Sequence, residues 1–381
     1  MEIIKPRSES ELAAALRECA EAGQSVQLGG QFSKTRLGGP LPATAAVIST
    51  AALSRVLRFE PRDLTISVEA GMPFGELRSL LNAHHVQLPL DPPFAADSTV
   101  GGVVAANLSG PRRRFFGAVR DMVIGMRFAT LEGALVQSGG MVVKNVAGLD
   151  MAKLMTGSFG TLAAITVLNF RLFPVQPRSA TFIFQFATLA EAAVQRDRIL
   201  QSALQPVALD LANPAAARRL GFDGALLLVR VEGSAAVVAR YRRELAGAAV
   251  IQETAEAALW QKVQEFVPTA LAENAEATVI RVSAKLHQTG DVLASFAAPA
   301  VARAGNGVVY ACLASPTEAA QWLQRARAPG WKTVVEATSP AGKAALELWP
   351  GPGGDFLLMR KIKQLFDPHN LLNPGRLYGR L

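Results

Sequence analysis

Residues 98–171 read STVGGVVAANLSGPRRRFFGAVRDMVIGMRFATLEGALVQSGGMVVKNVAGLDMAKLMTGSFGTLAAITVLNFR, and this stretch decides the fold. Glycines and other small residues recur in it where strand-like and helix-like runs turn. Glycine has no Cβ, so the backbone at such positions can come very close to a large, flat ligand. The polar residues that stand between them are Asn107, Asp121, Lys144, Asn145 and Asp150. The stretch therefore predicts a binding site for a bulky, phosphorylated ligand.

A glycine pair earlier in the chain is a second part of that site. It follows a strand-like run at residues 25–28 and opens a loop made of Gly29, Gly30, Gln31, Phe32, Ser33 and Lys34. Successive N–H groups after a strand can point into one concavity that holds phosphate oxygens, and a lysine adds charge. An ordinary turn is the alternative interpretation. The loop contains neither G-x-G-x-x-G nor G-x-x-x-x-G-K-[ST], which disfavours a Rossmann dinucleotide site and a nucleotide triphosphatase.

The beginning of the quoted stretch supplies hydroxyl groups next to glycines. Ser98 and Thr99 precede Gly101 and Gly102 in the order DSTVGG, which allows polar and backbone contacts with one ligand. The alternative is a plain helix N-terminus with an Asp or Ser cap. The arginine run at residues 112–114 has two interpretations as well, a docking or anion-binding surface and a solvated face.

The strongest motif is KNVAGLD at residues 144–150, followed by GSFGTL at 157–162 and by Ile165. In this order the stretch resembles the FAD-binding domain of the vanillyl-alcohol oxidase and p-cresol methylhydroxylase flavoproteins. Within that family it most resembles the short FAD-binding chain of glycolate oxidase. The family usually has Glu between the two glycines and Gly after the leucine, where this chain has Phe159 and Ala163. The C-terminal NPGR motif at residues 373–376 also resembles the family's closing segment.

The resemblance implies an FAD site and its residues. The loop at residues 29–34 matches the family's pyrophosphate loop, and residues 97–107 match the stretch that passes along the flavin. Asn373 is a candidate for reaching the isoalloxazine, with a simple turn as the alternative. The cofactor-binding residues predicted on this basis are Gly29, Gly30, Gln31, Phe32, Ser33, Lys34, Asp97, Ser98, Thr99, Val100, Gly101, Gly102, Asn107, Gly110, Gly157, Gly160, Ile165 and Asn373.

Attachment of the FAD is expected to be non-covalent. Covalent attachment in the family uses His, Cys or Tyr near the flavin, and residues 29–34 and 97–117 contain none of these. Side chains at the glycine positions would occupy the cofactor's space. Gly101→Val and Gly157→Val are therefore expected to lose flavin while some of the fold remains.

The fold class expected is α+β. Strand-like runs at 181–186, 225–232, 278–284, 307–313 and 333–337 alternate with helix-like runs at 189–204, 235–246, 255–266 and 317–327. This order favours an antiparallel sheet faced by helices. The resemblance implies a two-part FAD-binding domain of the p-cresol methylhydroxylase type at residues 1–177. An α/β cap domain would occupy residues 178–355, and a C-terminal segment at 356–381 would return to the FAD domain.

Catalytic residues are not identified by the sequence. Related 2-hydroxy-acid dehydrogenases carry a Gly-Glu-His-Gly string before the C-terminal helix, and this chain has no histidine there. The four histidines are interpreted as structural, with His287 the best remaining polar candidate on the cap; the others are His84, His85 and His369. No metal-ligand spacing appears, so no metal is expected.

The activity implied by the resemblance is oxidation of glycolate or a related 2-hydroxy acid to the 2-oxo acid. The chain would be the FAD-binding subunit of a glycolate oxidase complex. Its partners would be a larger FAD subunit and an iron–sulfur subunit, through which electrons pass to a quinone-type acceptor. The alternatives are a self-sufficient FAD-dependent 2-hydroxy-acid dehydrogenase and a flavin-free structural subunit.

Composition narrows the class of partner and the compartment. The net charge is +8 over 381 residues, but Lys and Arg are scattered and no nucleic-acid motif accompanies them. Two cysteines are too few for an iron–sulfur cluster, which takes about four thiolates. No signal peptide and no apolar run of about 20 residues is visible. We therefore expect a cytoplasmic protein without a direct membrane span, held at the inner membrane, if at all, through partner subunits.

Overall fold

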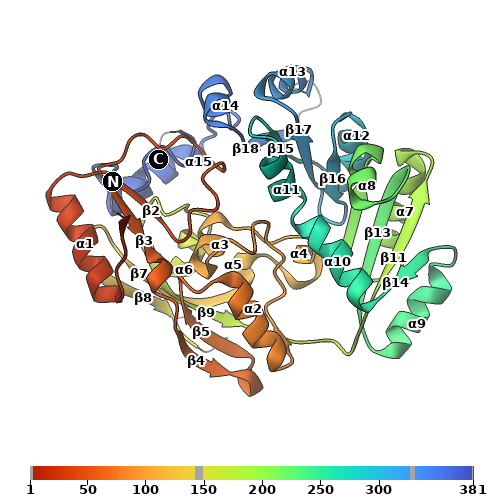
Figure 1. Cartoon of the computed structure of the whole chain (residues 1–381), viewed down its shortest axis with the longest axis horizontal. Coiled ribbons are helices and arrows are strands. Elements are labelled where there is room, and N and C mark those ends of the chain that lie inside the picture. Colours follow the sequence, from red (N-terminus) through yellow and green to blue (C-terminus); the bar gives the residue numbers. More distant parts are fainter. Residues whose placement is uncertain (1–2, 142–148, 327–330, 380) are drawn as a thin grey trace. The chain divides into compact units, whose positions relative to one another are not determined.

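The computed structural model describes residues 3–141, 149–326, 331–379 and 381, and it divides into two compact units. The first unit comprises Met1–Ser109, Gly117–Val175 and Gly351–Leu381, and the second comprises Gly110–Phe116 and Gln176–Pro350. Each unit is built around its own β-sheet structure (Figure 1). The short segment Gly110–Phe116 packs with the second unit, although the sequence-based division assigns it to the first.

The described residues of the first unit form three sheets. Three parallel strands lie in the order β1 (Ile3–Ile4), β3 (Ala46–Ser49), β2 (Val26–Gly29). Five antiparallel strands lie in the order β4 (Val56–Glu60), β5 (Thr65–Glu69), β9 (Ala164–Arg171), β7 (Val123–Ala129), β8 (Leu135–Gly139). A two-stranded pair joins β6 (Val86–Gln87) to β10 (Phe173–Pro174).

The helices of the first unit cover these sheets with their apolar sides. In α1 (Glu9–Glu21) the Ser8 hydroxyl accepts a hydrogen bond from the Glu11 N–H, and Leu12 and Leu16 are fully buried. A Ser cap and apolar residues four apart are the pattern of an amphipathic helix. The other helices are α2 (Phe74–Ala83), α3 (Val100–Ala106), α5 (Val119–Met122), α6 (Met151–Met155) and α15 (Asp355–Phe366). Leu371 and Leu372 belong to the same apolar cluster as α1, so the C-terminal segment completes this core.

The second unit contains one eight-stranded sheet in which every pairing is antiparallel. Its order is β14 (Ala249–Ile251), β11 (Arg178–Phe186), β13 (Ala225–Gly233), β12 (Ala208–Ala212), β16 (Ala300–Arg303), β17 (Val308–Leu313), β15 (Thr278–Ser283), β18 (Lys332–Ala337). This architecture confirms the predicted α+β class with an antiparallel sheet faced by helices.

The two faces of that sheet differ because side chains alternate along each strand. One face packs an apolar core against α7 (Leu189–Gln201), α9 (Ala235–Glu244), α12 (Thr289–Ala294) and α13 (Pro316–Ala326). Charged residues point to the other face, among them Asp210, Arg230 and Arg303, and that side carries α4 (Arg113–Phe116) and α10 (Glu253–Gln264). The remaining helices are α8 (Pro214–Leu220), α11 (Phe266–Glu273) and α14 (Pro340–Ala345).

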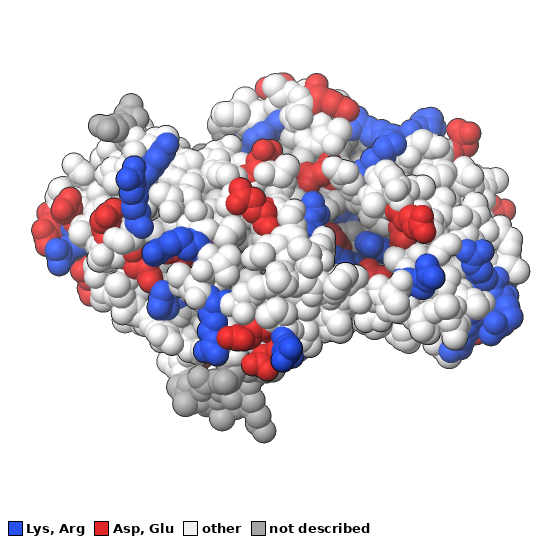
Figure 2. Space-filling model, turned by 60° about the horizontal axis from the view of Figure 1, so that its bottom comes forward, with Lys and Arg blue, Asp and Glu red and all other residues white. Residues whose placement is uncertain are grey.

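Surface charge is mixed on the face drawn in Figure 2. Lys and Arg stand there in small groups, separated by uncharged surface and by Asp and Glu. Among the described residues on this face, no continuous basic band of the kind that follows a nucleic-acid backbone is present. On this face, therefore, the Lys and Arg side chains form no single concentrated patch.

Candidate functional site

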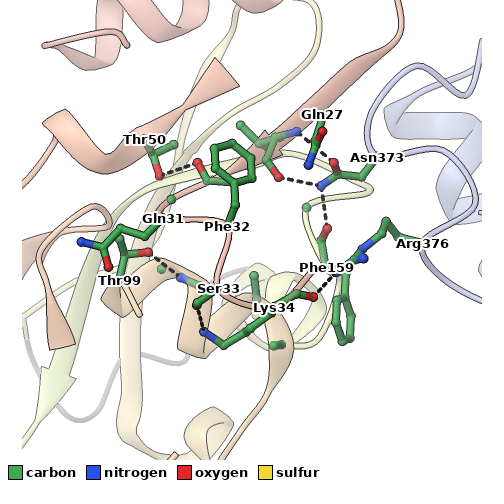
Figure 3. A pocket seen from close by; sticks show the side chains of 18 of the residues that line it. Gln27, Gln31, Phe32, Ser33, Lys34, Thr50, Thr99, Phe159, Asn373 and Arg376 are labelled. Carbon is green, nitrogen blue, oxygen red and sulfur yellow. Dashed lines mark hydrogen bonds between the residues drawn. The ribbon is translucent and has the colours of Figure 1, made fainter. Parts of the chain in front are cut away.

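An open cavity, with about 810 Å³ of space that includes solvent at its mouth, lies within the first unit and is the candidate site. Four parts of the chain line it: the loop after β2, the start of α3, the turn before β9, and the C-terminal segment after α15. Figure 3 shows Asn373 and Arg376 reaching this wall from the C-terminal segment, with Arg376 bonded to the carbonyl of Lys34.

The loop at residues 29–34 is held by its neighbours rather than by a regular turn. The Ser49 hydroxyl donates to the Gly30 carbonyl at 2.8 Å, and the Thr50 hydroxyl donates to the Gly29 carbonyl at 3.3 Å. At Gly30 a Cβ would overlap the Thr99 side chain, so the loop and the helix approach as closely as they do only with glycine there. The predicted glycine pair therefore serves a close approach of two backbone segments at the cavity wall.

Helix α3 begins at the cavity with a well-defined cap. The Thr99 hydroxyl accepts a hydrogen bond from the Gly102 N–H at 3.1 Å, which is an N-cap interaction. Both glycines of the DSTVGG motif, Gly101 and Gly102, line the cavity with Thr99. The hydroxyl of Ser98 is fully buried behind them and donates to the Phe94 carbonyl at 2.5 Å.

Lys34 places a buried positive charge at the cavity. The side chain is 9% exposed, and its ammonium donates to the Ser33 hydroxyl at 3.2 Å and to the Ser98 hydroxyl. It also lies 6.0 Å from the centroid of the Phe94 ring. These hydroxyl groups and the ring orient the ammonium at the cavity wall.

The C-terminal segment brings a second buried cation. Arg376 is 7% exposed and donates to the carbonyls of Lys34 at 2.9 Å and Thr35 at 3.2 Å, while its guanidinium lies 5.6 Å from the Phe159 ring centroid. No carboxylate of the described residues pairs with it. Desolvation accordingly lowers the pKa of Arg376 to about 10. Buried charge without a counter-ion is unfavourable unless a ligand supplies the opposite charge.

Asn373 joins three segments of the wall through its side-chain amide. The oxygen accepts from the Leu28 N–H at 2.9 Å, and the nitrogen donates to the carbonyls of Leu28 at 3.0 Å and Phe159 at 2.8 Å. These bonds orient the strand end of β2 and the turn at residue 159 toward the same space. The Asn373 side chain thus shapes the cavity through the backbone of its neighbours.

The lining fits an anionic ligand that also has a flat apolar part. Among the described residues that line it, Lys34 and Arg376 are cations and none is Asp or Glu. Apolar surface comes from Leu28, Phe32, Leu41, Ala105, Ala106, Phe159, Ala163 and Ile165. Positive charge beside apolar walls and a backbone loop suits a phosphorylated dinucleotide such as FAD. None of the described lining residues is His, Cys or Tyr.

Most of the predicted cofactor-binding residues line this one cavity. They are Gly29, Gly30, Gln31, Phe32, Ser33, Lys34, Thr99, Gly101, Gly102, Gly160, Ile165 and Asn373. Ser98 and Val100 are buried directly behind the wall, while Asp97 is exposed in the preceding turn and Asn107 ends α3. Gly110 lies in the second unit. The motif residues 142–148, with Lys144 and Asn145, lie outside the described residues.

Two of the predicted glycines are also required by the packing and backbone of the unit itself. A Cβ on Gly101 would come within 2.7 Å of the Ala70 Cβ, and Gly157 has φ +86° and faces Asn107. Gly101 is required because α3 packs against the chain before α2, and Gly157 because of its left-handed backbone. Valine at either position would therefore disturb the packing of the unit itself, rather than only the cofactor's space.

Several residues that line the cavity were not among the cofactor-binding residues predicted from the sequence. Phe159 and Ala163 were visible as departures from the family pattern, and Arg376 belonged to the quoted NPGR motif. Ala105 and Ala106 lie in the stretch 97–107 that the resemblance matched to the flavin, whereas no local pattern marks Gln27, Leu28, Thr35, Leu41 and Thr50, which line the cavity as well. The histidines lie elsewhere: none lines the cavity, and His287 is exposed in the second unit.

Comparison with known proteins agrees with this geometry. Residues 2–139 match the FAD binding domain family, and residues 352–377 match the C-terminal domain family of FAD linked oxidases. The solved structure of p-cresol methylhydroxylase superposes with a TM-score of 0.74 at 14% identity, covering 99% of this chain and 88% of that one. Alkyldihydroxyacetonephosphate synthase gives a TM-score of 0.71 at 18% identity, covering 98% and 77%.

The chain is an FAD-linked oxidoreductase with the p-cresol methylhydroxylase fold. FAD is its cofactor. Among curated relatives of this flavoprotein is glycolate oxidase subunit GlcE of Escherichia coli (strain K12), 29% identical over 92% of each chain. Mitochondrial D-lactate dehydrogenase [cytochrome] of Arabidopsis thaliana is 24% identical over 98% of this chain and 73% of its own. Glycolate oxidase subunit GlcD of Bacillus subtilis (strain 168) is 23% identical over 99% and 89%.

The cysteines, the candidate metal ligands and the helices of the flavoprotein give three further findings. Cys19 and Cys312 are both free and buried. Within the described part of the chain, no group of three or more His, Cys, Asp or Glu side chains is placed to hold a metal ion. None of the described helices is both long enough and apolar enough to cross a membrane.

Proposed function

We propose that the flavoprotein binds FAD non-covalently in the cavity of the first unit. Lys34 and Arg376 would meet its phosphates, because they are the cations of the lining and none of the described lining residues is acidic. The backbone of Gly29 and Gly30 would allow close approach, and Phe32, Phe159 and Ile165 would supply apolar contacts. That cavity, open and lined by two buried cations, is the observation that carries the proposal.

We propose further that the chain is the FAD-binding subunit of an enzyme of the glycolate oxidase type. Support comes from the similarity to glycolate oxidase subunit GlcE, which extends over 92% of both chains. The reaction would convert glycolate or a related 2-hydroxy acid into the 2-oxo acid with release of two electrons and two protons. FAD would supply the two-electron acceptor, and the protein would position it and set its electrostatic surroundings.

Electrons would leave this chain for an iron–sulfur subunit and then a quinone-type acceptor. The two buried cysteines are fewer than a cluster takes, so the cluster would belong to a partner subunit. A second, larger FAD subunit completes the proposed assembly. Localisation in the cytoplasm, with contact to the inner membrane through those partners, is part of the same proposal.

A self-sufficient 2-hydroxy-acid dehydrogenase is the second candidate. Its support is the similarity to D-lactate dehydrogenases, which extends over 98% of this chain in the Arabidopsis thaliana protein. The flavin-free alternative has less support, because the cavity is not filled by side chains of the protein itself.

The visible absorption spectrum of the purified chain tests these proposals. Flavin bands in the protein, or their appearance after FAD is added and the excess removed, support FAD binding. A colourless protein after that treatment would contradict it. Anaerobic addition of glycolate or D-lactate then separates the two candidates. Bleaching by the chain alone supports the self-sufficient enzyme, whereas bleaching that requires the partner subunits supports the glycolate oxidase type.

A further inference from the structure

The helix α15 of the first unit presents leucines to solvent. Leu357, Leu358 and Leu365 are 58%, 62% and 81% exposed, although leucine is among the residues most often buried. The side of α15 that is buried carries Phe356 and Lys363 instead. A surface helix normally turns its apolar side chains toward the core. The pattern of α15 is therefore inverted.

The contacts on the inner side of α15 do not use these leucines. The Lys363 ammonium donates to the carbonyls of Thr161 at 2.7 Å and Leu372 at 3.1 Å. It also pairs with the Asp367 carboxylate at 2.6 Å. These bonds tie the helix to the turn before β9 and to the C-terminal segment. The packing of the described fold therefore does not account for the leucines on the outer side.

The outer residues have the spacing of a seam between two helices. Leu358, Lys361 and Leu365 are three and four positions apart, which is the a–d–a spacing of a coiled coil. At about 100° per residue they lie on the side opposite Phe356 and Lys363. The seam is about 11 Å long, or two turns at about 1.5 Å per residue. These dimensions suit one partner helix.

The charge at this seam is positive. Lys361 stands between its two leucines, and Arg360 is exposed next to it. Residues 356–366 contain no Asp or Glu that could neutralise them along the helix. An ammonium that enters an apolar contact needs an opposite charge, because its desolvation is otherwise unfavourable. A partner that covers the leucines therefore has to bring a carboxylate level with Lys361.

We propose that the leucine face of α15, made of Leu357, Leu358, Lys361 and Leu365, binds a helix of a different protein. That helix presents apolar side chains around an Asp or Glu, which meets Lys361. The proposal does not rest on the proposed function, because neither the cavity nor the cofactor enters the argument.

Two other occupants fit the leucine face less well. Lys361 lies at the centre of the seam, so a two-fold pair of this chain would place two ammonium groups against each other. An anionic membrane attracts clusters of about four to eight basic residues, whereas Arg360 and Lys361 are the exposed basic residues of α15. Lys361 would also be pressed into the lipid together with the leucines.

Photo-crosslinking of the full chain in its own cells tests the proposal. A benzophenone amino acid in place of Gln364, which is exposed beside the seam, keeps the leucine face intact. Mass spectrometry of the crosslinked peptides then identifies the bound segment. We expect a segment of another protein with apolar residues three and four positions apart around an Asp or Glu. Lys361→Glu, and the double variant Leu358→Gln with Leu365→Gln, should each lower the crosslink yield about tenfold or more.

Val194→Gln is the matched control. Val194 is 52% exposed on α7 of the second unit, so its replacement should leave the crosslink yield unchanged. All the substituted side chains are exposed, and surface substitutions change stability little. The melting temperature by circular dichroism should therefore stay within about 2 °C of that of the unaltered protein. This measurement separates a lost contact from a lost fold.

The remaining outcomes would overturn the proposal. They are the absence of a crosslink, a crosslink to a second copy of this chain, and a crosslink to lipid. A bound segment without an acidic residue would also contradict it. So would a crosslink yield in Lys361→Glu equal to that of the unaltered protein, because the lysine would then have no part in recognition.

Discussion

Replacing Asn373 by alanine should loosen the cavity of the first unit. Its amide makes three hydrogen bonds, two to the backbone of Leu28 and one to the carbonyl of Phe159. The residue is 3% exposed, so water does not readily replace them. At about 1 kcal/mol for each hydrogen bond, the loss is about 3 kcal/mol. For domains of about 150–250 residues this corresponds to a fall in melting temperature of about 6–12 °C.

Asn370 offers a matched control in the same segment. Both residues have left-handed backbones, with φ +41° at Asn373 and +52° at Asn370, so alanine meets the same kind of strain at either position. Asn370, however, is exposed, and its side chain makes no hydrogen bond with a described residue. The difference in stability between Asn373→Ala and Asn370→Ala therefore measures what the three hydrogen bonds contribute to the stability of the first unit.

The release of flavin fluorescence on heating is the appropriate assay. All four tryptophans, at positions 260, 322, 331 and 349, lie in the second unit, so their emission reports on that unit instead. We expect Asn373→Ala to release flavin at a temperature about 6–12 °C lower than the unaltered protein does. Asn370→Ala should release flavin at a temperature close to that of the unaltered protein. Melting of the two variants within about 2 °C of one another would refute the reasoning.

Three more predictions follow from the described contacts. Lys34→Met should weaken FAD binding about tenfold or more, measured by equilibrium dialysis, because it removes a buried cation from the cavity. Lys361→Met, on the exposed side of α15, should leave the affinity for FAD unchanged. Equal affinities of the two variants for FAD would contradict this prediction. Thr99→Ala should lower the stability by about 1 kcal/mol, and the flavin-release temperature by about 2–4 °C, because it removes the cap of α3. Thr99→Ser should retain most of that stability, and equal losses in the two variants would exclude the cap. Burial raises the pKa of Cys312 and Tyr241 to about 12, so both ionise first in the unfolded chain. The stability that these two protonated groups contribute is complete below about pH 9 and is lost as the pH rises toward 12. The melting temperature followed by tryptophan emission should therefore be lower at pH 10.5 than at pH 8. In the double variant with Cys312→Ala and Tyr241→Phe, this difference between the two pH values should be smaller.

The regular elements were predictable where local pattern was strong. Leu12, Leu16 and Cys19 recur at helical spacing and lie on the buried side of α1. The alternating runs of the middle region became β11, β13, β15, β17 and β18. The strands β12, β14 and β16 were not predicted. They are short and contain alanine, which has little intrinsic preference for a strand, so their pairing partners decide their conformation.

The amino-acid sequence by itself determined where glycine leaves the backbone without a side chain and where apolar residues repeat. Those local properties predicted the glycine loop at residues 29–34, the start of α3 and the antiparallel sheet. Only the tertiary structure decided which charges matter. Arg376 reaches the carbonyl of Lys34 across 342 positions of sequence. Of the three consecutive arginines at 112–114, the folded chain buries Arg112 beside Glu232 and holds Arg114 on a backbone carbonyl. The side chain of Arg113 has no ion pair among the described residues. The energy of a charge depends on its burial and on its neighbours, and distant segments of the folded chain supply both.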